Sequence, residues 1–183
     1  MILPQAGVKN TEITLEEAIR VAGEREINFL VVASTCGDTA LKALEKTQNT
    51  SLQLVVVTHN TGFSNPDEQQ FSPAIRSQVE AAGHKVLSGT MVLRNLGSAI
   101  RSKFKYSEAE IVNATLRMFG QGIKVVVEIA AMAADAGLIP AENIMCVAGT
   151  GRGADTAAIL KADSSNRFFD IKIREIVVKP AEF

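Results

Sequence analysis

The chain has 183 residues, enough for one domain with a continuous core, and we expect a single domain over residues 1–183. Its 19 Lys and Arg residues nearly balance its 20 Asp and Glu residues, and the absence of a basic block argues against nucleic acid as a partner. No apolar run approaches the length of a membrane span, and the N-terminal segment lacks the features of a secretion signal. We therefore expect a cytoplasmic protein with no membrane partner.

The first half of the chain alternates helical and strand patterns. Thr14 to Glu17 has the form of a capping box and predicts a helix that runs to about Ala22. A short run rich in β-branched residues predicts a buried strand over 27–33, and a helical pattern follows over 39–46. The next elements that we expect are a strand over 52–57, a helix over 73–82 and a short strand over 85–87.

The second half continues the alternation. A capping box at 107–110 begins a helical stretch to about Ala136, which the glycines at 120–122 kink or divide. A strand is expected over 143–148, a helix over 154–161 and a closing strand over 171–178. Because polarity alternates along this last segment, we expect it at an edge of the sheet and antiparallel to its neighbour.

This order of elements predicts an α/β fold with a mostly parallel sheet and helices on both faces. In such sheets, ligands bind outside the carboxyl ends of the strands. Two glycine-bearing turns, at 34–39 and 148–156, and the segment 58–63 would all meet at this edge. The long polar stretch over 61–72 is expected to form a mobile lid.

Both glycine turns follow apolar runs and precede predicted helices, a pattern that suits the binding of phosphate. In the first turn, hydroxyls and backbone N–H groups would surround a phosphate, with Gly37 admitting close approach. Cys36 completes this turn, and the carboxylate of Asp38 would oppose a phosphate unless it points outward. The binding residues expected here are Ser34, Thr35, Cys36, Gly37, Asp38 and Thr39.

The second turn offers a cation, because Arg152 stands between two glycines and suits a phosphate or a ring carbonyl. Asp155 either accepts a hydrogen bond from a sugar-type hydroxyl or caps the helix that follows. The binding residues expected in this turn are Gly149, Thr150, Gly151, Arg152, Gly153, Asp155 and Thr156. After the strand over 52–57, we expect His59, Gly62 and Phe63 to lie near the ring of a ligand.

Residues 34–40, Ser-Thr-Cys-Gly-Asp-Thr-Ala, and the turn at 148–156 resemble the corresponding turns of the pyruvate kinase C-terminal α/β domain. The segment from Glu128 to Gly137 is more closely similar to free-standing archaeal and bacterial proteins of this type. The resemblance implies a three-layer α/β/α sandwich that binds flavin mononucleotide (FMN). It implies no pyruvate kinase activity, which belongs to a separate barrel domain. Cys36 and Asp38 depart from the family pattern, which counts against regulation by a sugar bisphosphate.

We therefore expect a protein that binds a phosphorylated small molecule, with FMN as the first candidate and no metal site. An alternative is an enzyme, flavin-dependent or acting on a phosphorylated metabolite, with His59, Cys36 or Asp155 in acid–base roles. No catalytic motif supports it. A regulatory protein that senses a sugar phosphate is a further alternative, and homo-oligomerisation stays open. Cys36 and Cys146 are expected to be free thiols.

Overall fold

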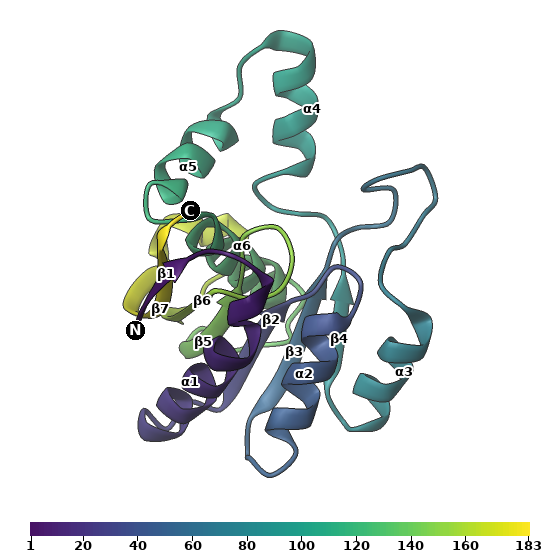
Figure 1. The fold of residues 1–183 in the computed structure, drawn as a ribbon. Coiled ribbons are helices and arrows are strands. Elements are labelled where there is room, and N and C mark those ends of the chain that lie inside the picture. The colour runs from purple at the N-terminus through teal and green to yellow at the C-terminus, as the bar shows by residue number, and fades with distance from the viewer.

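The computed structural model describes residues 1–183 and shows one seven-stranded sheet with helices on both faces (Figure 1). This confirms the α/β sandwich with a mostly parallel sheet. The strands are β1 Ile2–Gln5, β2 Phe29–Ala33, β3 Gln53–Thr58, β4 Lys85–Ser88, β5 Asn143–Ala148, β6 Thr156–Lys161 and β7 Lys172–Glu182. The helices are α1 Thr11–Glu24, α2 Asp38–Thr47, α3 Pro73–Ala81, α4 Asn95–Phe104, α5 Glu108–Arg117 and α6 Gln121–Asp135, with short 3₁₀ segments η1 Val8–Asn10 and η2 Ser165–Asp170.

The strands lie in the order β1-β7-β6-β5-β2-β3-β4. Strands β5, β2, β3 and β4 are parallel neighbours, whereas β6 is antiparallel to both β5 and β7. The antiparallel pairing of the last strand is therefore confirmed, but β7 does not lie at the edge. It pairs in parallel with β1, which forms the edge and which the sequence patterns did not predict.

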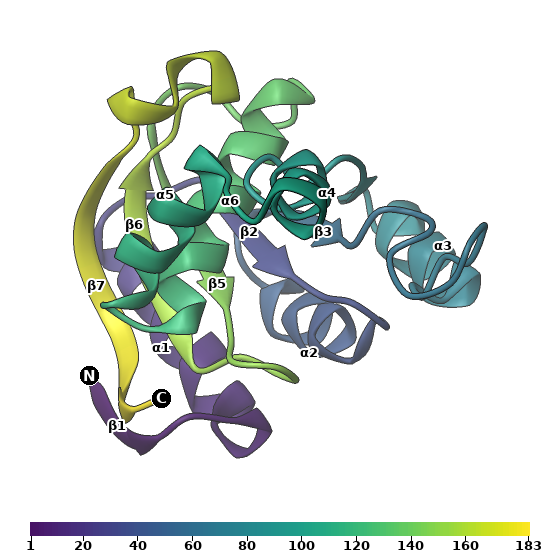
Figure 2. The ribbon, with the colours of Figure 1, turned by 90° about the horizontal axis from the view of Figure 1, so that it is seen from above.

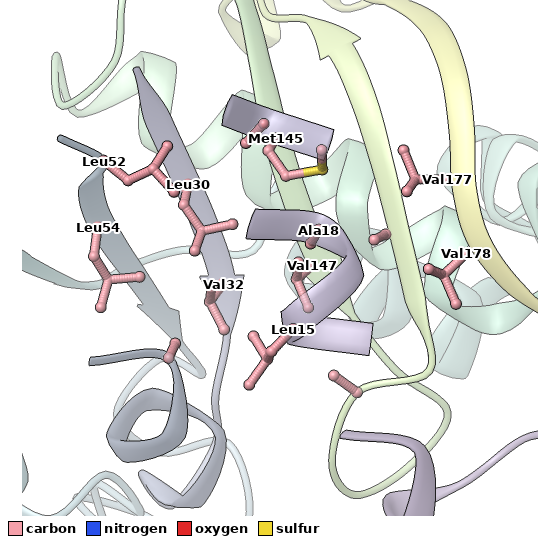
Figure 3. Close-up of a cluster of buried hydrophobic side chains, with 14 of the residues drawn as sticks. Leu15, Ala18, Leu30, Val32, Leu52, Leu54, Met145, Val147, Val177 and Val178 are labelled. Carbon is pink, nitrogen blue, oxygen red and sulfur yellow. The ribbon is translucent and has the colours of Figure 1, made fainter. Parts of the chain in front are cut away.

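Alternate residues of the central strands point to opposite faces of the sheet, where they belong to two separate hydrophobic clusters. On one face, Leu30 and Val32 pack with Leu15 and Ala18 of α1 (Figure 3). On the other face, Val31 packs against α6, whose buried side includes Ile123 and Val126. Figure 2 shows α1 and α2 on one side of the sheet and α6 with α5 on the other. Burial on both faces explains why β2 and β3 are continuously apolar in sequence.

One predicted helix is wrong. Residues 154–161 form no helix, because Thr156–Lys161 is the strand β6, paired residue by residue with β5. The second glycine turn is therefore the loop of a β-hairpin, closed by a hydrogen bond from Asp155 N to Ala148 O at 3.1 Å. It has no helix dipole to offer a ligand, and Asp155 caps no helix.

Several helix boundaries also differ from those expected. Helix α1 begins at Thr11, so Thr14 lies inside it with its buried hydroxyl unpaired rather than capping its N-terminus. The division of the later helix at 120–122 is confirmed, since α5 ends at Arg117 and α6 begins at Gln121. Helix α4 was not predicted, and none of its residues is buried. None of the helices has the length and hydrophobicity that crossing a membrane requires.

Candidate functional site

A cavity of about 520 Å³ lies at the carboxyl end of the central strands. Both glycine-bearing loops and the segment after β3 contribute to its wall, so the expected convergence of these three segments is confirmed. Predicted residues that line it are Ser34, Thr35, Cys36, Asp38, Thr39, His59, Phe63, Gly149, Gly151, Arg152 and Gly153. Its size lies within the range of roughly 300–1,000 Å³ that is typical of small-molecule sites.

The first turn leads from β2 into the N-terminus of α2. Ser34 fixes this turn, because its N–H donates to Val57 O at 3.0 Å and its Oγ accepts from Ala40 N at 3.2 Å. The N–H groups of Asp38 and Thr39, at the first two positions of α2, have no helical acceptor. Two backbone donors and the positive end of the helix dipole therefore lie at the wall of the cavity, an arrangement that favours an anion.

Gly37 has a different task from the one expected. It does not line the cavity, and a Cβ added to it would lie 2.3 Å from Cδ1 of Ile75. Its φ of +120° is also one that L side chains rarely adopt. Glycine is needed here because the turn packs against α3, rather than because a ligand approaches its backbone.

The loop between β5 and β6 packs closely on the segment that precedes α1. A Cβ at Gly153 would lie 2.4 Å from Thr11 Oγ1 and 2.7 Å from Val8 Cα, and one at Gly149 would lie 2.4 Å from Gly153 O. Thr11 Oγ1 also accepts a hydrogen bond from Ala154 N at 3.0 Å. These contacts fix the loop and leave the exposed Arg152 at the cavity.

Asp155 and Thr156 lie outside the cavity, and both are fully buried. Asp155 Oδ2 accepts from Gly7 N at 3.0 Å and from Thr150 N at 3.1 Å, while its Oδ1 accepts from Thr156 Oγ1 at 2.9 Å. Every oxygen of this carboxylate thus has a partner within the chain. The arrangement gives Asp155 a structural task and leaves it no contact with a ligand in the cavity.

The segment after β3 supplies aromatic groups. The rings of His59 and Phe63 lie with their centroids 3.9 Å apart, and the guanidinium of Arg94 lies 4.7 Å from the Phe63 centroid. Burial lowers the pKa of His59, although a hydrogen bond to Gln70 at 3.4 Å opposes this shift. A planar ring system would find both an aromatic surface and a cation here.

Two further predicted residues, Gly62 and Thr150, lie outside the cavity wall. The structure adds residues that the sequence patterns did not single out, namely Val8, Thr11, Ala33, Lys42, Gln70, Arg94, Gln121 and Val125. Arg94 and Arg152 take part in none of the ion pairs of the chain, whereas Lys42 pairs with Glu12. No sequence motif marks Arg94 or Gln121, because each reaches the cavity from the start of a separate helix.

Both cysteines are free, as expected. Cys36 is exposed at the cavity, and burial raises the pKa of the Cys146 thiol. Met132 on α6 is buried, whereas Met118 and Phe119, which follow α5, are exposed. No group of three or more His, Cys, Asp or Glu side chains has a metal-binding arrangement.

No family model matches the chain. Similar solved structures include a pyruvate kinase from Cryptosporidium parvum, with 14% identity, a TM-score of 0.44 and coverage of 86% of this chain and 23% of that chain. Cryptosporidium parvum pyruvate kinase in complex with ADP gives 14% identity, a TM-score of 0.42 and coverage of 93% and 24%. O-ureido-L-serine synthase gives 12% identity, a TM-score of 0.33 and coverage of 69% and 48%.

The chain thus spans about a quarter of the length of the pyruvate kinase chains that it resembles. At such low TM-scores these similarities say nothing about function. The fold assignment rests on the sheet and helices of the chain itself.

Proposed function

We propose that this protein binds a phosphorylated small molecule in the cavity at the carboxyl end of its sheet, and that the ligand is FMN. The observation that carries the proposal is that a single cavity is lined by both the N-terminal turn of α2 and the His59–Phe63 ring pair. A phosphate joined to a planar ring system needs these two kinds of contact together.

The phosphate is assigned to the α2 turn. Thr35 and Thr39 bring hydroxyl donors to the cavity beside the backbone N–H groups of Asp38 and Thr39. Arg152 adds a cation from the β5–β6 loop, and it forms no ion pair within the chain. These groups fit a phosphate by their donor chemistry. The exposed carboxylate of Asp38 opposes it, which favours one phosphate group over two.

The ring is assigned to the aromatic side of the cavity. Phe63 and His59 offer ring faces, and Arg94 offers a cation for a carbonyl edge. Gln70 and Gln121 line the same cavity with amide groups that suit the hydroxyls of a polyol chain. We therefore assign the contacts with ligand hydroxyls to Gln70 and Gln121 rather than to Asp155 and Thr156, whose side chains are hydrogen-bonded within the chain.

A titration with FMN tests the proposal. We expect quenching of flavin fluorescence and saturable binding by calorimetry, with riboflavin, which lacks the phosphate, at least about tenfold weaker. Arg152→Gln should weaken FMN binding roughly tenfold but leave riboflavin binding unchanged. Arg174→Gln is the matched control, because Arg174 is exposed on β7 away from the cavity.

Two outcomes would contradict the choice of ligand. Absence of a fluorescence change and of a thermal shift at millimolar FMN would exclude flavin. Tighter binding of a sugar bisphosphate than of FMN would support the regulatory alternative instead. Redox turnover of bound FMN with an added electron donor would extend the proposal from a binding protein to a flavin-dependent enzyme.

A further inference from the structure

A smaller recess of about 100 Å³ adjoins the cavity on the side of α6. Both are lined by Thr35, His59, Arg94 and Gln121, so the two spaces are neighbours. The recess has residues of its own at its wall, namely Val57, Thr58, Met91, Lys124, Glu128, Ile129 and Met132. None of these was expected at a site, and the proposed phosphorylated ligand uses none of them.

A buried ion pair lies at this recess. Lys124 Nζ donates to Glu128 Oε2 at 2.5 Å, and the two side chains are only 3% and 2% exposed. Glu128 Oε1 accepts from Leu93 N at 2.8 Å, so both carboxylate oxygens have partners. An ammonium group has three N–H donors, and Glu128 takes one of them. Lys124 therefore brings two further donors to the recess, and burial without acceptors for them is unfavourable.

The basic residues at the recess outnumber the acidic ones by one. Lys124 and the exposed Arg94 are the basic residues, and Glu128 is the only acidic residue of the wall. Burial lowers the pKa of Lys124, and the charge and the hydrogen bond of Glu128 oppose this shift. His59 favours its neutral form, because burial lowers its pKa. One negative charge from a ligand balances the site, whereas a dianion would reverse its sign.

The rest of the wall is apolar. Met91, Ile129 and Met132 face the recess from α6 and from the segment before α4. An alkyl group would pack against these side chains, and two methionines adapt readily to its shape. A bare phosphate or sulfate has no group that gains from this surface.

We propose that the recess binds a short aliphatic monocarboxylate, whose carboxylate accepts hydrogen bonds from Lys124 Nζ and whose alkyl group lies against Met91, Ile129 and Met132. The carboxylate takes the two free donors of Lys124, and Arg94 balances the second negative charge of the Glu128–ligand pair. The recess and the proposed FMN site share Arg94 at their common wall, but propionate binding does not require flavin to be bound.

Calorimetric titration with sodium propionate tests this site, with sodium phosphate and sodium chloride as comparison anions. We expect saturable binding of propionate and weaker binding of both comparison anions. Lys124→Met should reduce propionate affinity at least about tenfold, because it removes a charged donor at nearly constant volume. Arg174→Gln is the control, since Arg174 is exposed on β7 and lines neither the recess nor the main cavity, and it should leave propionate affinity unchanged.

A second variant covers the chance that Lys124→Met fails to fold with an unpaired Glu128. The double variant Lys124→Met/Glu128→Leu removes both charges, and such replacements of buried pairs are often tolerated. We expect it to unfold cooperatively in urea and to bind no propionate. Unchanged propionate affinity in either folded variant would overturn the proposal. So would tighter binding of phosphate than of propionate, or no saturable binding at 100 mM propionate.

Discussion

The carboxylate of Asp155 accepts a hydrogen bond from the backbone N–H of Gly7 at 3.0 Å, and it thereby joins the β5–β6 loop to the segment after β1. The same Oδ2 accepts from Thr150 N, within the loop itself. One buried side chain thus connects the N-terminal segment to the wall of the cavity. Its substitution should affect the stability of the whole domain.

We expect Asp155→Ala to lower the free energy of unfolding by roughly 2–4 kcal/mol, because it leaves buried N–H groups without an acceptor. Urea denaturation followed by circular dichroism measures this loss. Asp170→Ala is the matched control, since Asp170 is 55% exposed and pairs only with Arg167 on η2. Its effect should stay below about 1 kcal/mol. Equal effects of the two substitutions would contradict the structural task of Asp155.

The glycines of the β5–β6 loop offer a matched pair. Gly151 and Gly153 have φ values of +77° and +76°, but a Cβ at Gly151 would meet nothing within 4 Å, whereas one at Gly153 would meet Thr11 and Val8. Gly151→Ala should therefore cost about 1–2 kcal/mol from backbone strain alone. Gly153→Ala should cost more, because Val8 Cα cannot move without shifting the chain. Thermal unfolding of both variants compares them, and equal midpoints would contradict the close packing of this loop.

The two histidines predict a dependence of stability on pH. Burial lowers the pKa of both His59 and His84 below the ordinary value of about 6.5. As pH falls below that value, the unfolded chain binds protons at these side chains before the folded chain does, so the free energy of unfolding decreases. Urea midpoints at about pH 7.5 and 5.5 should show this decrease. His59→Gln should show a smaller decrease than the wild type, and an identical pH profile would contradict it.

The two thiols should react very differently. Cys36 is exposed, and Cys146 is buried, with the pKa of its thiol raised. We expect iodoacetamide to label Cys36 alone in the folded protein and both residues in urea, as measured by mass spectrometry. Cys36→Ser should keep FMN affinity within about twofold, since a small hydroxyl replaces the thiol at the cavity wall. Labelling of Cys146 at the same rate as Cys36 without denaturant would contradict the burial of β5.

The sequence predicted the elements whose signals are local. Strands β2 and β3 have unbroken apolar runs, and the pair of loops at the carboxyl ends of β2 and β5 follows from the parallel order of those strands. These features were sufficient to place most of the cavity wall. The position of the α2 turn was predicted, because a small-residue turn before a helix has a distinct composition, but the packing of Gly37 against α3 was not.

The features that were missed depend on distant parts of the chain. Residues 156–161, Thr-Ala-Ala-Ile-Leu-Lys, have no strong local preference for helix or strand. They form a strand because they pair with β5 on one side and with β7 on the other. Strand β1 has only four residues and forms through its pairing with β7. Lys124 is one charged residue within an apolar helix, and only the folded chain shows Glu128 beside it and a recess in front of it.

The cavity is bounded by two loops that are attached to the fold in different ways. The β5–β6 loop is held at its base by antiparallel pairing and along its length by Thr11 and Asp155. Half of the residues from His59 to Ser72 are exposed, and hydrogen bonds such as that from Gln69 Nε2 to His59 O at 3.1 Å join the two ends of this segment. The buried ring of Phe71 and Ser72 N, which donates to Cys36 O, attach the segment at its end. The two sides of the opening thus differ in how they are attached to the sheet, and His59, Phe63 and Gln70 lie on the side that is anchored at its end. If a phosphorylated ligand binds as proposed, we expect this side to adjust to the rest of the molecule while the α2 turn and Arg152 keep their positions.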